Sequence, residues 1–378
     1  MTRVTLDGNG TNAGERLYMA FELGDKSWRL GFTEGKRVRQ VRVAALDRAE
    51  TMKAIAQAKE KFKLGSDCAV VACYEAGWEG FWLARWLESE GVEVRVVDSS
   101  SIEVDRRARR AKTDRIDTDK LLRLLLRHEH GERKALRVVR VPSPQEEDRR
   151  QLDRERAELV KERGRHWVRI KSLLRAQGIR LERKRGFEEQ LAQMRQWNGE
   201  PLGDELLERL KREWARHEMV AGQIQALEDK QERLVAQSQE VAHQQVAQLM
   251  QLKSVGYQSA WRLTMEFFSW RGFKNRREVA ALAGLTPSPY TSGESSREQG
   301  ISKAGNRRVR TTMIELAWLW LRHQPQSALS QWFQSRFGGG SKRQRRIGIV
   351  ALARKLLVEL WRYLQSGALP AGAQLKTA

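Results

Sequence analysis

The stretch Val70-Val-Ala-Cys-Tyr-Glu75-Ala-Gly77 is an apolar run that ends in a carboxylate, with a glycine two residues later. An apolar run of this length that is bounded by a turn residue predicts a buried β-strand. Glu75 then stands at the carboxyl end of the strand, where open α/β sheets bind their ligands. The stretch therefore predicts a sheet together with a functional residue at its edge.

Similar apolar runs surround this strand and are separated by turns. Together they predict five strands, at residues 17–21, 28–32, 38–44, 69–73 and 92–97. Helix-like stretches at residues 48–62 and 78–90 lie between the third and fourth and between the fourth and fifth strands. Three strands, a helix, a strand, a helix and a strand is the order of a ribonuclease-H-like α/β sheet. We expect this domain to span residues 17–145, after a disordered lead at residues 1–16.

The domain is predicted to close with a helix that has Thr113 as its N-cap and runs to Leu126. Pro142 and Pro144 then break the chain, and a polar stretch with helical spacing follows at residues 146–251. It predicts two long helices that form an extended arm, with a break near Gly199–Gly203.

The arm contains a repeat that is typical of a coiled coil. Apolar residues recur every seven positions, at Val220, Leu227, Leu234 and Val241. Polar Gln231 and Ser238 occupy the complementary positions and weaken the seam. Because an apolar seam needs a partner helix, we expect a second subunit to supply one.

The last part of the chain regains Trp, Phe and Leu and contains short helical stretches between Gly, Pro and Ser. It predicts a compact helical domain at residues 252–366 and a flexible tail at residues 367–378. The expected fold class is therefore α/β plus all-α: a ribonuclease-H/RuvC-like domain, a helical coiled-coil arm and a C-terminal helical domain.

The charge of the chain points to a polyanionic partner. Lys and Arg number 70 against 48 Asp and Glu, so the formal net charge is +22 and the sequence pI is about 10.4. A protein with this field attracts nucleic acid strongly. No stretch approaches the roughly twenty apolar residues of a membrane span, which argues against a membrane partner.

The cysteines exclude two classes of stabilised fold. Cys68 and Cys73 have no CxxC spacing and no neighbouring histidine cluster, so neither a zinc ribbon nor a disulfide framework is implied. A reducing cytoplasm is the expected location.

Four acidic residues stand where the predicted sheet would gather them. They are Glu22 after the first strand, Glu75 after the fourth, and Asp114 and Asp117 on one face of the closing helix. Clustered carboxylates repel unless a cation compensates, and hard oxygen ligands suit Mg²⁺ or Mn²⁺. Such a site supports phosphodiester chemistry. The alternative is four surface carboxylates that pair with the many arginines.

Two further acids, Asp25 and Asp119, are close competitors for this role. We interpret them as solvated neighbours. A basic run directly precedes the acidic helix and is predicted to bind nucleic-acid backbone, through Arg106, Arg107, Arg109, Arg110 and Lys112. The alternative interpretation of this run is a solvated linker.

The candidate nucleophile is Ser292, in the run Tyr290-Thr-Ser-Gly293. Pro287 and Pro289 disfavour a helix, so an irregular loop is expected there. Basic residues follow that can hold phosphates, namely Lys303, Arg307, Arg308 and Arg310. A serine beside arginines suits attack on a phosphodiester, although Ser-Gly in a Pro-rich loop is also ordinary turn chemistry.

Taken in order, six short motifs resemble one known family. They are Tyr18-Met-Ala-Phe-Glu22, Tyr74-Glu75-Ala-Gly77, Lys112-Thr-Asp114-Arg-Ile-Asp117, Leu282-Ala-Gly-Leu-Thr-Pro287, Tyr290-Thr-Ser292-Gly293 and Ser302-Lys-Ala-Gly305. The family is that of the DEDD-type transposases of bacterial insertion sequences, in the insertion-sequence family that bears the number one hundred and ten. Its members join a RuvC-like domain to a C-terminal transposase domain with an essential serine.

The resemblance implies roles for individual residues. Glu22, Glu75, Asp114 and Asp117 would form the metal-binding tetrad, and Ser292 would become joined to DNA. It also implies a structured guide RNA from the same element that pairs with donor and target DNA. The helical arm would then serve assembly into a homo-dimer or tetramer.

The chain departs from the family pattern at two places. The first acid is usually Asp, whereas this chain has Glu22, which moves the carboxylate one methylene further out. The usual hairpin of Pro-Gly-x-Gly type appears as Val255-Gly256-Tyr257-Gln258, without its second glycine. Contact between that turn and DNA is therefore in question.

The sequence as a whole predicts a metal-dependent DNA transposase or recombinase in which Ser292 attacks a phosphodiester. Two alternatives stay open. One is a RuvC-like nuclease that hydrolyses DNA junctions with water, and the other is a non-catalytic nucleic-acid-binding scaffold. We further expect the arm to hold the two domains of one chain apart, so that Ser292 of one subunit meets the acidic residues of another. The alternative is an arm that folds back as a hairpin and delivers Ser292 to the acidic residues of its own chain.

Overall fold

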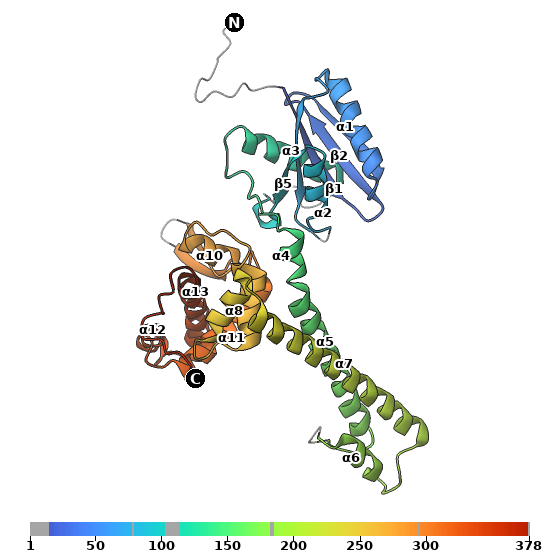
Figure 1. The fold of residues 1–378 in the computed structure, drawn as a ribbon, viewed down its shortest axis with the longest axis vertical. Coiled ribbons are helices and arrows are strands. Elements are labelled where there is room, and N and C mark those ends of the chain that lie inside the picture. The colour runs from blue at the N-terminus through green and yellow to red at the C-terminus, as the bar shows by residue number, and fades with distance from the viewer. Residues whose placement is uncertain (1–14, 78, 103–113, 182–184, 293–294, 377–378) are drawn as a thin grey trace. The chain divides into compact units, whose positions relative to one another are not determined.

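The structure is a computed structural model that describes residues 15–77, 79–102, 114–181, 185–292 and 295–376 (Figure 1). It divides into two compact units, Met1–Pro142 and Ser143–Ala378. Each unit has its own hydrophobic core, as expected for a chain of this length. Within the described part of the chain, no helix is long and apolar enough to cross a membrane.

The first unit is built on a five-stranded mixed sheet, which confirms the five predicted strands. The strands are β1 (Arg16–Leu23), β2 (Ser27–Thr33), β3 (Val38–Ala44), β4 (Ala69–Glu75) and β5 (Glu93–Val97). Their order is β3-β2-β1-β4-β5. The hairpins β1–β2 and β2–β3 are antiparallel. Strand β4 is parallel to β1, and β5 is parallel to β4. This mixed α/β topology is consistent with a RuvC-like domain.

Helices cover both faces of this sheet because its strands are apolar on both sides. They are α1 (Arg48–Phe62), α2 (Trp82–Ser89) and α3 (Asp114–Glu129), with the short 3₁₀ turn η1 (Ser99–Ser101) before α3. Met19 and Phe21 of β1 pack with α1 and α2 on one face. Tyr18 and Ala20, which point the other way along the same strand, pack with α3. Cys73 is buried beneath α3 and, like Cys68, is a free thiol.

The arm of the second unit is a helical hairpin. Its helices are α4 (Pro144–Asp148), α5 (Gln151–Arg175), α6 (Phe187–Gln193) and α7 (Asp204–Gln237). The long helices α5 and α7 lie side by side (Figure 1). Arg156 Nε lies 2.6 Å from Glu228 Oε1 near one end and Arg169 Nη1 lies 2.7 Å from Glu213 Oε1 further along, so the two helices run antiparallel.

This hairpin corrects the expected coiled-coil seam. Helix α7 ends at Gln237, and Val241 opens the next helix with 67% of its surface exposed, so the fourth seam position is outside the arm. Val220 is buried in the helix pair, and the polar Gln231 is wholly buried as well. The partner helix that the seam needs is α5 of the same chain. The break between the long helices is also wider than a single turn, since it contains α6.

The remainder of the second unit is helical, with one hairpin. Its elements are α8 (Val241–Met250), α9 (Tyr257–Leu263), the π-helical turn η2 (Thr264–Phe268), α10 (Arg276–Leu282), β6 (Pro287–Ser292), β7 (Ser295–Ile301), α11 (Arg307–His323), α12 (Ala328–Phe337) and α13 (Lys342–Ser366). Large side chains such as Trp261, Phe267 and Trp320 are fully buried in one core. The sequence predicted a compact helical domain here but not the strands β6 and β7.

The tail of the chain is held in place, which differs from the flexible segment that was expected. Leu375 forms a β-bridge with Leu252, and the Lys376 backbone N–H donates to Gln251 O at 2.7 Å. The Lys376 ammonium also donates to Val255 O at 3.0 Å, at the start of the turn that lacks its second glycine. Short-range sequence patterns gave no sign of this pairing, because the two partners lie more than a hundred residues apart.

Candidate active site and nucleic-acid interface

Glu22 and Glu75 lie on neighbouring strands at the same edge of the sheet. In the parallel pairing of β1 and β4, Phe21 is the partner of Tyr74, and the two glutamates are the next residues along each strand. Side chains alternate along a strand, so both glutamates point to the face that also carries Ala20 and Cys73. That face is covered by α3.

Helix α3 runs antiparallel to β1 and brings its own first turn toward this edge. Near its end, Glu129 Oε2 lies 4.0 Å from Arg16 Nη1 at the beginning of β1. Near its start, Thr118 packs on Gly31, where any Cβ would lie 2.6 Å from the Thr118 methyl carbon Cγ2. Gly31 is the strand partner of Ala20, two residues before Glu22. The first turn of α3, with Asp114 and Asp117, therefore lies at the end of β1 that carries Glu22.

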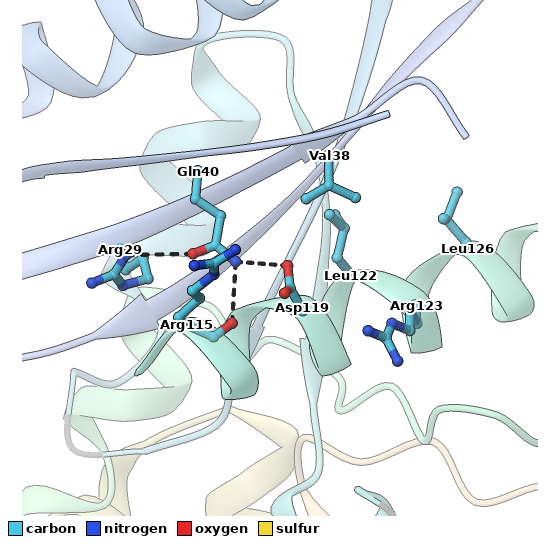
Figure 2. A pocket seen from close by; sticks show the side chains of 8 residues that line it. All are labelled: Arg29, Val38, Gln40, Arg115, Asp119, Leu122, Arg123 and Leu126. Atoms are coloured by element: carbon cyan, nitrogen blue, oxygen red, sulfur yellow. Dashed lines mark hydrogen bonds between the residues drawn. The ribbon is translucent and has the colours of Figure 1, made fainter. Parts of the chain in front are cut away.

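A glutamine on β3 fastens the beginning of α3 to the sheet (Figure 2). Gln40 Nε2 donates to the Arg115 carbonyl oxygen at 3.1 Å and to Asp119 Oδ1 at 2.6 Å. Arg29 Nη1 donates to Gln40 Oε1 at 3.4 Å. Asp119 is thus tied to β3 and is half-buried, which corrects its interpretation as a solvated neighbour. Asp25, by contrast, is exposed.

A cavity of about 420 Å³ opens beside this glutamine, between the edge of the sheet and α3. Figure 2 shows the side chains that line it, among them Arg29, Arg115 and Arg123. Asp119 is the acidic residue in the lining. The cavity is therefore positively charged overall and lies on the same face of the sheet as the predicted acidic site.

The acidic residues suit a hard divalent cation by chemistry, since carboxylate oxygens are the ligands that Mg²⁺ and Mn²⁺ prefer. Within the described part of the chain, no three acidic, histidine or cysteine side chains come together as a metal site. The side chain of Asp114 lies outside the described residues. Glu75 is exposed.

The basic residues predicted to hold phosphate differ in their surroundings. The run at residues 106–112 lies outside the described residues. Arg308 Nη1 pairs with Asp153 Oδ2 at 3.1 Å, and Arg310 Nη1 donates to the carbonyls of Ala283 and Lys303 at 3.2 and 3.0 Å. Burial and the neighbouring Arg307 lower the pKa of Arg310. Arg308 and Arg310 are thus engaged in the fold, whereas Lys303 and Arg307 are exposed.

Ser292 is the last residue of β6 and pairs with Ser295 across the hairpin, so it lies on a strand and not on the irregular loop that was expected. Pro287 and Pro289 are accommodated because the ladder has an irregularity between them. The Ser292 side chain is outside the described residues, as are residues 293–294. The pairing of the two strands continues one residue beyond their base, where the Ser302 backbone N–H donates to Thr286 O at 2.8 Å.

Two glycines from distant motifs meet beneath this hairpin. A Cβ on Gly284 would lie 2.6 Å from Ala304 O, and one on Gly305 would lie 2.9 Å from the Gly284 nitrogen. Both glycines also have positive φ, at 67° and 124°. The close backbone contact between these two segments therefore requires the glycines of both motifs, Leu282-Ala-Gly-Leu-Thr-Pro287 and Ser302-Lys-Ala-Gly305.

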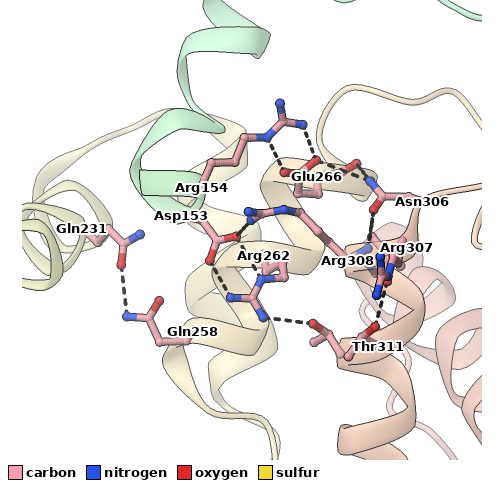
Figure 3. A network of polar contacts seen from close by, with 12 residues as sticks. Asp153, Arg154, Gln231, Gln258, Arg262, Glu266, Asn306, Arg307, Arg308 and Thr311 are labelled. Atoms are coloured by element: carbon pink, nitrogen blue, oxygen red, sulfur yellow. Dashed lines mark hydrogen bonds and ion pairs between the residues drawn. The ribbon is translucent and has the colours of Figure 1, made fainter. Parts of the chain in front are cut away.

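Sequence reasoning missed a buried polar network in the second unit (Figure 3). Asp153 of α5 is wholly buried and is bound by Arg262 of α9. Glu266 of η2 is 1% exposed and accepts hydrogen bonds from Arg154 at 2.7 and 2.9 Å. Asn306 also donates to Glu266, at 3.4 Å. The one available signal was Glu266 itself, a carboxylate inside the otherwise uncharged run Thr264–Phe268.

The charge on Glu266 is stabilised by its neighbours. Burial by itself would raise the pKa of this carboxyl, but the hydrogen bonds and charge of Arg154 outweigh it. Arg150 and Arg308 contribute further positive charge, and the pKa of Glu266 lies below its ordinary value. The network therefore holds an ionised carboxylate between α5, η2 and α11.

Comparison with known proteins gives two family matches in the order of the two halves of the chain. Residues 32–178 match a model described as a transposase, of the DEDD type of IS110. Residues 246–331 match the model described as "Transposase IS116/IS110/IS902 family". The first match contains Glu75, Asp114 and Asp117, and the second contains Ser292.

Individual relatives carry the same description. "Putative transposase y4rJ" of Sinorhizobium fredii is 42% identical over 96% of this chain and 95% of its own length. "Putative transposase y4qE" of the same organism is 31% identical over 70% of this chain and 61% of its own length. "Transposase for insertion sequence element IS1111A" of Coxiella burnetii is 29% identical over 52% of each chain.

Proposed function

The chain belongs to the IS116/IS110/IS902 family of DEDD transposases, and from this premise we propose that it excises and inserts an insertion sequence by metal-dependent phosphodiester transfer with Ser292 as nucleophile. As a transposase it is an enzyme that acts on DNA. The observation that supports the proposed chemistry best is the common edge of the sheet, where Glu22, Glu75 and the first turn of α3 come together.

Four carboxylates would hold Mg²⁺ or Mn²⁺ at this edge, those of Glu22, Glu75, Asp114 and Asp117. A bound cation of this kind stabilises the negative charge that develops on phosphate oxygens. Glu22 lies one residue before the end of β1, at the edge of the sheet where the site is proposed. Gln40 and Arg29 position the helix that carries the two aspartates.

Ser292 would attack the phosphorus atom of one DNA strand. A bond forms between the serine Oγ and phosphorus, the bond between phosphorus and the leaving sugar oxygen breaks, and that oxygen takes up the proton that the serine loses. The number of phosphate ester bonds is unchanged, so the strand can be rejoined later without an energy source. A structured guide RNA and assembly of several subunits are further parts of this proposal.

Trapping of a covalent adduct tests the proposed nucleophile. DNA from the ends of the element is incubated with protein in Mg²⁺, denatured, and separated by size. We expect a denaturation-resistant adduct with the wild-type protein and with Ser288→Ala, a matched change on the same strand, but not with Ser292→Ala. Cleavage without any adduct would instead show hydrolysis by water, as in a junction nuclease. Absence of cleavage in every protein, with binding retained, would favour the scaffold alternative.

A further inference from the structure

A second basic cavity lies in the C-terminal part of the chain, between α10 and α13. Its volume is about 380 Å³, within the usual range of ligand sites. Cations surround it on both helices, namely Arg276, Arg277, Arg354, Lys355 and Arg362. Glu359 is the acidic residue in the lining, and Ala280 and Val358 form apolar parts of the wall. The two helices that bear the cations pack on each other (Figure 1).

Most of these cations are not used by the fold. Glu359 is already bound by Arg362, with Nη1 and Oε1 2.8 Å apart. Lys355 is placed over the ring of Trp332, with its ammonium 4.7 Å from the ring centroid. Within the described residues, Arg276, Arg277 and Arg354 have no carboxylate partner. Arg308 and Arg310, by contrast, already bind acceptors within the protein, namely the Asp153 carboxylate and the Ala283 carbonyl oxygen.

Unpaired cations around one cavity repel each other, and this repulsion is relieved when an anion binds. Guanidinium groups are suited to phosphate because their donors match two phosphate oxygens at once. The apolar wall adds a surface for the sugar carbons on either side of a backbone phosphate. The chemistry of the cavity therefore fits a phosphodiester better than a carboxylate metabolite.

A row of cations on α13 favours a polymer over a free phosphate ion. The helix begins with Lys342, Arg343, Arg345 and Arg346, all exposed, and has no acid in its first turn. Cations at a helix N-terminus interact unfavourably with the helix dipole, so an external anion gains from their presence. Arg343 and Arg354 are eleven residues apart, about three turns, and so share one face of the helix.

The position of the cavity relative to Ser292 favours DNA as the polymer. Thr286 lines the cavity and directly precedes β6, whose last residue is Ser292. Six residues of extended strand cover at most about 20 Å. With a rise of about 3.4 Å per base pair, this corresponds to up to about six base pairs of duplex.

We propose that the α10–α13 cavity binds a backbone phosphate of the same DNA duplex that Ser292 attacks, within about six base pairs of the cleaved position. Arg276, Arg277 and Arg354 contact this phosphate, and the cations at the start of α13 follow the backbone further. The assignment of DNA rests on the proposed function of Ser292, whereas the assignment of a phosphodiester rests on the cavity alone.

The test measures binding in the absence of metal, so that it does not depend on cleavage. Full-length protein is titrated with a duplex DNA fragment, and with an RNA hairpin of equal length, over a range of salt concentrations. In Arg276→Gln/Arg277→Gln/Arg354→Gln the affinity for duplex DNA should fall, and the slope of log affinity against log salt should become shallower by about 0.9, since the cavity neutralises one phosphate and each neutralised phosphate contributes about 0.9. The lysine triple variant at the same positions should keep the slope.

The matched control removes the same charge from the arm, as Arg175→Gln/Arg180→Gln/Arg209→Gln, where all three side chains are exposed. Unchanged thermal unfolding of both triple variants shows that the fold is intact. The proposal is overturned if the cavity variant and the control bind duplex DNA with the same affinity and slope. A defect confined to the RNA hairpin would also overturn it, because the cavity would then serve the guide. Failure of the adduct experiment alone would leave the binding site in place.

Discussion

Asp153 and Arg262 form a buried bidentate ion pair, with both carboxylate oxygens 2.9 Å from guanidinium nitrogens. Asp153 is the third residue of α5, and Arg262 lies in α9 of the C-terminal core. A carboxylate that is completely buried must have its charge compensated, and Arg308 supplies a second guanidinium at 3.1 Å. The pair therefore joins the base of the arm to the domain that carries Ser292 (Figure 3).

Removal of Asp153 should destabilise the second unit strongly. We expect Asp153→Ala to lower the free energy of unfolding by about 3–5 kcal/mol, because two guanidinium groups lose their buried partner. Urea denaturation measures the change. Glu208→Ala, which breaks an exposed contact with Lys211 on α7, is the control and should change the free energy of unfolding far less. Equal effects of the two changes would contradict a structural role for the buried pair.

The ionised Glu266 should make this part of the protein sensitive to acid. Its pKa is lowered in the folded state, so as the pH falls the unfolded state takes up the proton first and stability decreases. The contribution is present above the unfolded pKa of about 4.3 and is lost as the pH falls through the lower folded value. The difference in unfolding free energy between wild type and Glu266→Gln should therefore be largest near pH 7 and shrink toward about pH 3. A difference that grows in acid would contradict the assignment.

The acidic edge should be required for cleavage but not for binding. Glu75→Gln and Asp117→Asn should reduce strand cleavage in Mg²⁺ by about a hundredfold or more, since several kcal/mol of charge stabilisation are lost. Nucleic-acid affinity should persist because the basic surface supplies it. Asp25→Asn, an exposed acid near the same strand end, is the matched control and should cleave normally. Full cleavage by either edge variant would remove that residue from the mechanism.

Gln40 should act as a positioning residue for α3. Gln40→Leu removes two hydrogen bonds to the first turns of the helix, a net loss of about 1–3 kcal/mol of local stability. Faster amide hydrogen exchange in the first turns of α3 and a higher Mg²⁺ requirement for cleavage should result. Arg39→Gln alters the neighbouring residue, which points to the opposite face of β3, and should change neither measurement. Exchange rates as in wild type would contradict the role.

The sharing of one active site between subunits remains a prediction. The arm seam is covered within the chain by α5, but Val168 and Met219 leave apolar surface exposed on both arm helices, at 61% and 59%. A mixture of Ser292→Ala and Asp114→Ala proteins should recover strand transfer if one chain supplies the serine and another the acids. Mixed oligomers without activity would show that each chain uses its own residues.

Local sequence patterns were sufficient to predict the sheet and the position of two of its acids. Short apolar runs around Phe21 and Tyr74 predict the two strands. Because the carboxylates come directly after these runs, their position at the strand ends follows as well. Helix α3 was also predictable, because its apolar residues recur at helical spacing after an acidic first turn. These features depend on a few neighbouring residues, and local sterics and hydrophobic patterning decide them.

Other features depend on contacts between segments that are far apart in the sequence. The partner of α7, the hairpin of Ser292 and the pairing of the tail with Leu252 each join segments whose sequence patterns carry no information about each other. The same holds for charge: Arg308 and Arg354 are both arginines in basic surroundings, but the first meets the buried Asp153 and the second faces a cavity. Which cations remain available to a ligand depends on where each carboxylate comes to lie, and only the folded chain fixes those long-range distances.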